Sequence, residues 1–116
     1  TSYFFNFEKV SKRTHLDIAS VNSACLLEME GEKIRQAHIS AGGVSPIPLY
    51  LKNASTALIG KEISAETLRE INGIMQAEIS PISDARGSEA YKRLLLRQLF
   101  FAHFLTFFPK VSIAWA

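Results

Sequence analysis

Apolar side chains recur at helical spacing through the last third of the chain, along a segment from residue 88 to residue 108. Ser88 can cap the first turn with its hydroxyl, and Pro109 cannot continue the hydrogen-bond ladder, so these residues bound the predicted helix. Leucine and phenylalanine also fill most of the remaining circumference, which indicates a helix covered on more than one side. The stripe consists of Tyr91, Leu94, Leu95, Leu99, Ala102, Leu105 and Phe108, and the other apolar positions are Leu96, Phe100, Phe101, Phe104 and Phe107.

Extended segments are predicted in the first third of the chain. Residues Phe4–Val10 combine aromatic and β-branched side chains, as strands do. The segment Leu16–Met29, taken alone, fits a helical stripe slightly better than a strand. A polar break at residues 30–32 precedes the alternating segment Ile34–Ser40, which implies a tight hairpin, and a hairpin requires residues 26–30 to be extended. The residues by themselves leave both interpretations open.

The rest of the chain is predicted to be helical. A loop rich in glycine and proline at residues 41–48 leads to a short helix, Leu49–Ile59, with Gly60 after its end. Ser64 can cap a further helix, Ala65–Glu78. Strands over about residues 3–42 and helices over about 49–108 predict an α+β fold. We expect a single domain (residues 1–116), with an antiparallel three- to four-stranded sheet packed on one face by three helices.

Composition narrows the function classes. The chain has 116 residues, 47% of them hydrophobic, and a formal net charge of +2, too small by itself to indicate nucleic-acid binding. Cys25 is the only cysteine, so no disulfide can form within the chain. Charged residues interrupt the most apolar segment, and no signal peptide is recognisable, so we expect a cytoplasmic protein without a membrane span. The chain begins without methionine, and we expect it to be part of a longer protein.

Three blocks, in order, resemble one family. They are FEKVSKRTHLDIASVNSA, IRQAHISAGGVSPIPLYLKNA and PISDARGSEAYKRLLLRQLF, and together they cover most of Phe4–Pro109. They are similar to the C-terminal domain of the FAD-binding subunit of molybdenum hydroxylases, as in the small subunit of bacterial xanthine dehydrogenases and the CO dehydrogenase flavoprotein. The resemblance implies a long strand, a turn and a second long strand in the first third of the chain, which decides between the two interpretations above.

The resemblance also implies a function. In that family a molybdenum–pterin centre hydroxylates the substrate, and electrons pass through iron–sulfur clusters to FAD and then to NAD. A preceding N-terminal domain, absent from this chain, makes most of the FAD contacts, including those to the pyrophosphate. This domain would close one side of the flavin pocket. The molybdopterin and the iron–sulfur clusters would be held by partner domains or subunits, and the isolated chain would be inactive and carry no stoichiometric FAD.

Basic residues close to the end of the first strand are the candidate cofactor-binding residues. Lys9, Lys12 and Arg13 lie there, and a bland interpretation is a solvated loop with an Arg13–Asp17 ion pair. The resemblance favours a functional interpretation for Lys9 and Arg13, because family members tend to carry basic residues at these positions beside the isoalloxazine ring. His15 and Leu16 depart from the family, in which acidic residues are frequent there. No catalytic or metal-binding residue is predicted.

The remaining polar residues have structural interpretations that compete with functional ones. Asp84 and Arg86 precede the last helix. They can pair and hold the loop in place, or they can help the N-terminus of the helix to bind an anion. Arg93 and Arg97 are one helical turn apart, which weakly indicates an acidic partner surface. His103 lies among aromatic residues and is expected to be a hydrogen-bonded core residue.

Two alternative functions follow from the residues. Five phenylalanines on the last helix (100, 101, 104, 107 and 108) are more than one intramolecular face should hold, so some should meet another domain or a second copy, as in a dimerisation module. The second alternative is a nucleic-acid-binding domain, which the lack of an aromatic and basic strand consensus opposes. Its basic residues would be Lys9, Lys12, Arg13, Arg35, Lys92 and Arg93.

Overall fold

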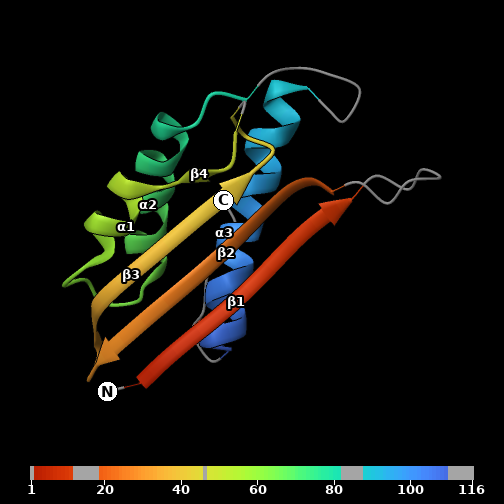
Figure 1. Cartoon of the computed structure of the whole chain (residues 1–116). Coiled ribbons are helices and arrows are strands. Elements are labelled where there is room, and N and C mark those ends of the chain that lie inside the picture. Colours follow the sequence, from red (N-terminus) through yellow and green to blue (C-terminus); the bar gives the residue numbers. More distant parts are fainter. Residues whose placement is uncertain (1, 12–18, 46, 82–87, 110–116) are drawn as a thin grey trace.

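A computed structural model describes residues 2–11, 19–45, 47–81 and 88–109 of the chain. Within these residues, four antiparallel strands form one sheet in the order β1-β2-β3-β4 (Figure 1). The strands are β1 (Ser2–Ser11), β2 (Ala19–Glu30), β3 (Lys33–Gly42) and β4 (Leu49–Tyr50). The predicted hairpin is confirmed: β2 and β3 meet at a tight turn in which Gly31 adopts a φ of +63°. The helical interpretation of the segment before it is therefore wrong.

The predicted start of the first helix is also wrong. Leu49 and Tyr50 were expected to be helical but form β4, which pairs with Ala41 and Ser40 of β3. The backbone N–H of Leu51 also donates to the carbonyl of Ile39, at 2.8 Å, so the segment is held by the sheet before the chain can turn. The helix, α1, is the shorter segment Lys52–Leu58, and Gly60 follows its end with a φ of +85°, as predicted.

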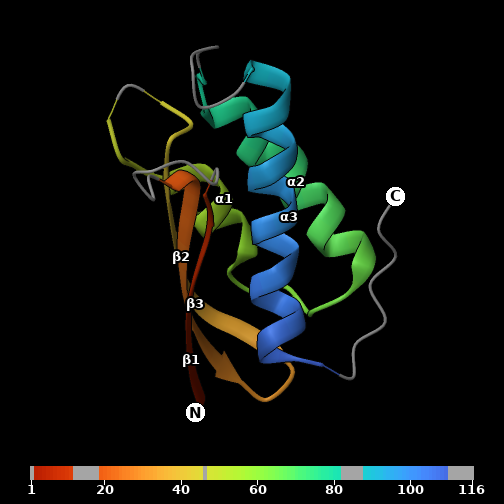
Figure 2. The same ribbon diagram turned by 90° about the vertical axis from the view of Figure 1, so that its right-hand side faces the viewer.

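The other two helices are α2 (Ala65–Glu78) and α3 (Glu89–Phe107). Both predicted caps are confirmed, because the hydroxyls of Ser64 and Ser88 accept backbone N–H groups of the first turn, each at 3.1 Å. α1 packs on β3, α3 packs on β1 and β2, and α2 packs on α1 and α3. Seen edge-on, the helices all lie on one side of the sheet (Figure 2), which confirms the predicted architecture.

The phenylalanines of α3 are accommodated within the domain. Phe100, Phe101 and Phe104 are fully buried, and Phe107 and Phe108 are half-buried against Phe4 of β1, with ring centroids 5.5 and 5.0 Å from it. The edge strand thus supplies an aromatic partner for the end of the helix, and the expectation that some of these rings meet another surface stays a prediction. α3 is covered on more than one side, by β1 and β2 and by α2, as its all-round apolar character indicated.

No helix within the described residues is long and apolar enough to cross a membrane.

Candidate functional site: the open face of the sheet

The sheet face opposite the helices carries the exposed side chains that alternate with core residues along the strands. In β1, every second residue from Tyr3 to Lys9 is exposed, whereas in β2 the buried residues start at Val21 and leave the even-numbered positions on the other face. Figure 2 shows that the described helices leave this side of the sheet uncovered. We call it the open face; it comprises Tyr3, Phe5, Phe7, Lys9, Asn22, Ala24, Leu26, Glu28, His38, Ser40, Gly42 and Tyr50.

Lys9 lies at one end of the open face. It lies within the predicted strand Phe4–Val10 and belongs to β1, where it is exposed and stands opposite Asn22 of β2, which in turn is opposite Gly42 of β3. Placement on a strand rather than in a loop fixes the direction of the side chain, because alternate residues of a strand point to opposite faces. Arg13, the other predicted site residue, lies outside the described residues.

Asn22 extends this row of the site, and sequence reasoning missed it. A Cβ atom on Gly42 would come within 2.7 Å of the Asn22 amide nitrogen, so the amide lies over the glycine and only glycine leaves room for it. Opposing residues of antiparallel strands have Cβ atoms about 5 Å apart, which places the Asn22 side chain next to Lys9. The signal in the sequence was the glycine in register with an asparagine, visible only once the strand pairing is known.

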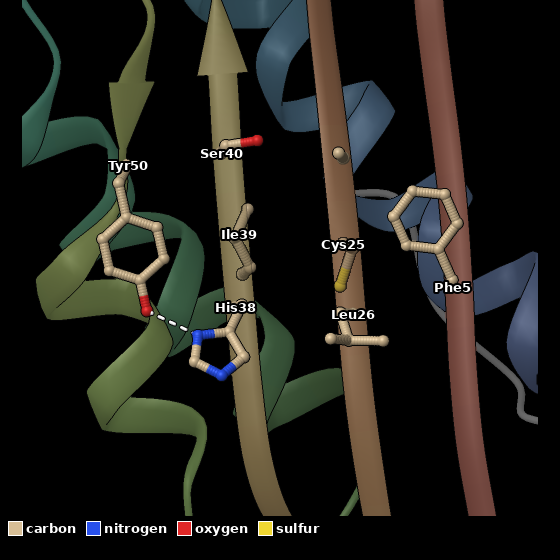
Figure 3. A pocket seen from close by; sticks show the side chains of 8 residues that line it. Phe5, Cys25, Leu26, His38, Ile39, Ser40 and Tyr50 are labelled. Carbon is tan, nitrogen blue, oxygen red and sulfur yellow. Dashed lines mark hydrogen bonds between the residues drawn. The ribbon is translucent and has the colours of Figure 1, made fainter.

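The middle of the open face is apolar and slightly hollowed. Phe5 stands opposite Leu26, and Leu26 stands opposite His38, whose Nδ1 lies 2.9 Å from the hydroxyl of Tyr50. These side chains border a shallow hollow of about 180 Å³, seen from close by in Figure 3. The volume is below the 300–1,000 Å³ of a typical small-molecule pocket, so the hollow fits a protruding side chain better than a cofactor.

A buried polar network lies beneath the open face. His103 of α3 is fully buried; its Nδ1 is 3.0 Å from the Asn6 amide nitrogen and its Nε2 is 3.0 Å from the Ser23 hydroxyl. The Asn6 amide also donates to Glu8, and the Ser23 hydroxyl donates to the carbonyl of Ser40. Because the Ser23 proton is used, Nε2–H donates to Ser23 and Nδ1 accepts from Asn6, so the imidazole is neutral. His103 is a hydrogen-bonded core residue, as predicted.

Electrostatics agree with this assignment. Burial lowers the pKa of His103 to about 4, against a smaller opposing effect of the Glu8 carboxylate. Burial raises the pKa of the Cys25 thiol to about 12, so this side chain is a small apolar core residue and not a nucleophile. Within the part of the chain that the structure describes, no three His, Cys, Asp or Glu side chains are grouped to hold a metal ion.

The other candidates from the sequence have structural roles or lie outside the description. Asp84 and Arg86 are outside the described residues, as is the Arg13–Asp17 pair. Arg93 has an acidic partner within the domain, because it pairs with Glu89 at 3.3 Å. It also donates to the Gln76 carbonyl at 2.7 Å.

Two further basic residues do not support a nucleic-acid surface. Arg35 pairs with Glu28 at 3.2 Å, and Lys92 is buried. Of the six basic residues considered for such a surface, Arg35 is thus paired with a carboxylate and Lys92 is withdrawn from solvent.

Comparison with known proteins points to one group. Residues 6–107 match the family model described as the CO dehydrogenase flavoprotein C-terminal domain. The chain is 28% identical to the glyceraldehyde dehydrogenase medium chain of Sulfolobus acidocaldarius, over 80% of this chain and 33% of that one. It is 30% identical to the xanthine dehydrogenase of Blastobotrys adeninivorans, over 91% of this chain and 8% of that one. The chain thus spans about a third of the medium-chain relative and a small part of the xanthine dehydrogenase.

The fold agrees with this match. A crystal structure of the Cu,Mo-CO dehydrogenase in its cyanide-inactivated form superimposes with a TM-score of 0.78 and 26% identity, over 86% of this chain and 35% of that one.

Proposed function

Because the chain belongs to the CO dehydrogenase flavoprotein C-terminal domain family, we propose that it closes one side of the flavin pocket in the FAD-binding subunit of a xanthine-dehydrogenase-like molybdenum hydroxylase. In that enzyme, electrons from a molybdenum centre would travel through iron–sulfur clusters to FAD and then to NAD. The two relatives act, by their names, on glyceraldehyde and on xanthine, so the family does not determine the substrate.

One observation carries the proposal: an exposed lysine lies at the end of an uncovered, largely apolar face. Lys9 has no described ion-pair partner, and the side chain of its neighbour Asn22 makes no hydrogen bond with another described residue. The ammonium group can therefore face an anion, and the amide can donate to or accept from a carbonyl or ring nitrogen. These groups fit the edge of a flavin ring system.

FAD, when bound, would accept electrons singly or in pairs and deliver a hydride to NAD. The contribution of this chain would be electrostatic. Positive charge at Lys9 would stabilise the negative charge that a reduced flavin carries, and the apolar rows next to it would keep water away and strengthen that interaction. The small volume of the central hollow agrees with most FAD contacts coming from another part of the flavoprotein.

Lysine footprinting of the complete flavoprotein tests the proposal. Acetylation of Lys9 by a water-soluble reagent should be slower in the FAD-loaded protein than in the flavin-stripped protein. Lys52, exposed at the start of α1, is the matched control and should react equally in both. Equal rates for Lys9 with and without FAD, measured by peptide mass spectrometry, would exclude it from the flavin pocket.

A further inference from the structure

The open face has an apolar centre that is unusual for a solvent-facing surface. Tyr3, Phe5 and Phe7 of β1 are 69%, 68% and 53% exposed. Leu26 of β2 stands opposite Phe5 and continues the patch across the sheet. Tyr50 of β4 lies at the far end of the row that starts at Phe7 and crosses β2 and β3. Contiguous exposed apolar side chains of this kind mark interaction sites. The phenylalanines of α3, in contrast, are buried or half-buried, so the most exposed aromatic side chains of the described residues are on the sheet.

The positions of the charges on the open face indicate how a partner would be oriented. Charges stand only at the two ends of the open face: Lys9 at one end, and Glu28, paired with Arg35 at 3.2 Å, at the other. The rows between them are uncharged and include the hollow bordered by Phe5, Leu26 and His38, into which one apolar side chain of a partner could insert (Figure 3). A complementary surface would be apolar at its centre and negative where it meets Lys9.

We infer that the open face is the docking surface for the flavin-binding portion of the same flavoprotein; this inference rests on the proposed function. The patch is continuous with Lys9, because Phe5 and Phe7 precede it on the same face of β1, so a partner that brings an anionic flavin to Lys9 would extend readily over these two rings. The family description makes this chain a C-terminal domain, and it spans 33% of the medium-chain relative, which leaves about two-thirds of such a chain to supply the covering surface.

The arrangement gives the apolar rows a role beyond adhesion. A partner seated on Phe5 and Phe7 would exclude water from the sheet up to the row of Lys9 and Asn22. The charge of Lys9 would then act through a medium of low dielectric constant, where it is felt more strongly than in water. The open face would thus have two roles: its apolar rows would dock the flavin-binding portion, and Lys9 at its end would tune the flavin.

Site-specific photo-crosslinking in the complete flavoprotein tests the inference. Phe5 is replaced with p-benzoylphenylalanine, an aromatic residue that keeps the ring on the strand, and the matched control carries the same residue in place of Leu94, which is 45% exposed on α3. After irradiation, peptide mass spectrometry should find the position-5 probe joined to the flavin-binding portion, and the position-94 probe not joined to it.

The other outcomes overturn the inference. A crosslink from position 5 to a second copy of this chain would make the open face a dimer interface, and a crosslink to an iron–sulfur or molybdenum subunit would assign it to that subunit. A crosslink within this domain, or none at all, would mean that no partner domain covers the face. If position 5 joins the flavin-binding portion while FAD leaves Lys9 acetylation unchanged, the docking surface stands and the proposed flavin pocket fails. If FAD slows the acetylation of Lys9 but position 5 does not join the flavin-binding portion, the proposed flavin pocket stands and the docking surface fails.

Discussion

The Nε2 atom of His103 lies 3.0 Å from the hydroxyl of Ser23, which joins the long helix α3 to the interior strand β2. The imidazole is fully buried and neutral, with its second nitrogen accepting from Asn6. A protonated His103 would present a donor to the Asn6 amide, which already donates to Glu8. Charging this ring would therefore break the link to β1, the strand that carries Lys9.

Stability should fall in acid because of this histidine. The pKa of His103 is about 4 in the folded protein against an ordinary value of 6.5, so its stabilising effect is complete above pH 6.5 and is lost as the pH falls toward 4. The loss should reach about 3 kcal/mol of unfolding free energy. His103→Gln, which cannot titrate, should lack this part of the pH dependence. Urea unfolding at several pH values checks it; equal pH profiles for the two proteins would contradict it.

Glu78 should stabilise α1 from another helix. α1 has no side-chain cap of its own, and the Glu78 carboxylate at the end of α2 accepts the backbone N–H groups of Asn53 and Ala54, each at 2.8 Å. Glu78→Ala should therefore cost about 2 kcal/mol of unfolding free energy, and Glu78→Gln less. Glu32→Ala, at an exposed turn residue, is the control. Chemical denaturation that shows the same loss for both alanine variants would rule out the cap.

These contacts show where sequence reasoning succeeds and where it stops. Local signals were sufficient for the caps at Ser64 and Ser88 and for the Gly31 turn, because each acts within a few residues. The Glu78 cap joins residues 24 and 25 positions apart, and no local pattern predicts such a contact.

The same limit applies to the aromatic residues and to the site. Phe107 and Phe108 looked unpartnered because their partner, Phe4, is at the other end of the chain. Lys9 was found through the family resemblance, whereas its neighbour Asn22 emerged only from the strand register.

Gly42 should be intolerant of a side chain because of Asn22. The added methyl of Gly42→Ala would meet the Asn22 amide at about 2.7 Å and displace it, at a cost of about 1 kcal/mol. In an Asn22→Ala background the same methyl has room, so Gly42→Ala should be neutral or stabilising there. A double-mutant cycle of unfolding free energies measures the coupling. Additive effects of the two substitutions would mean that the amide does not lie over the glycine.

Cys25 should be unreactive in the folded protein. It is fully buried, and burial raises its pKa to about 12, so almost no thiolate exists at pH 8. Since it is the only cysteine, reaction with a disulfide reagent such as DTNB reports on this site alone. The thiol should react slowly in native buffer and rapidly in concentrated urea. Full labelling of the native protein at the rate of a free thiol would contradict the packing of β2.

The flavin potential of the Lys9→Ala variant tests the central claim most directly. If Lys9 stabilises the reduced flavin, its removal should lower the midpoint potential of FAD in the complete flavoprotein. One partly screened charge corresponds to about a tenfold change in the binding ratio of oxidised to reduced flavin, or roughly 30 mV for a two-electron couple. Lys52→Ala should leave the potential unchanged. An unaltered potential in Lys9→Ala would show that Lys9 is a surface lysine and that this domain does not tune the flavin.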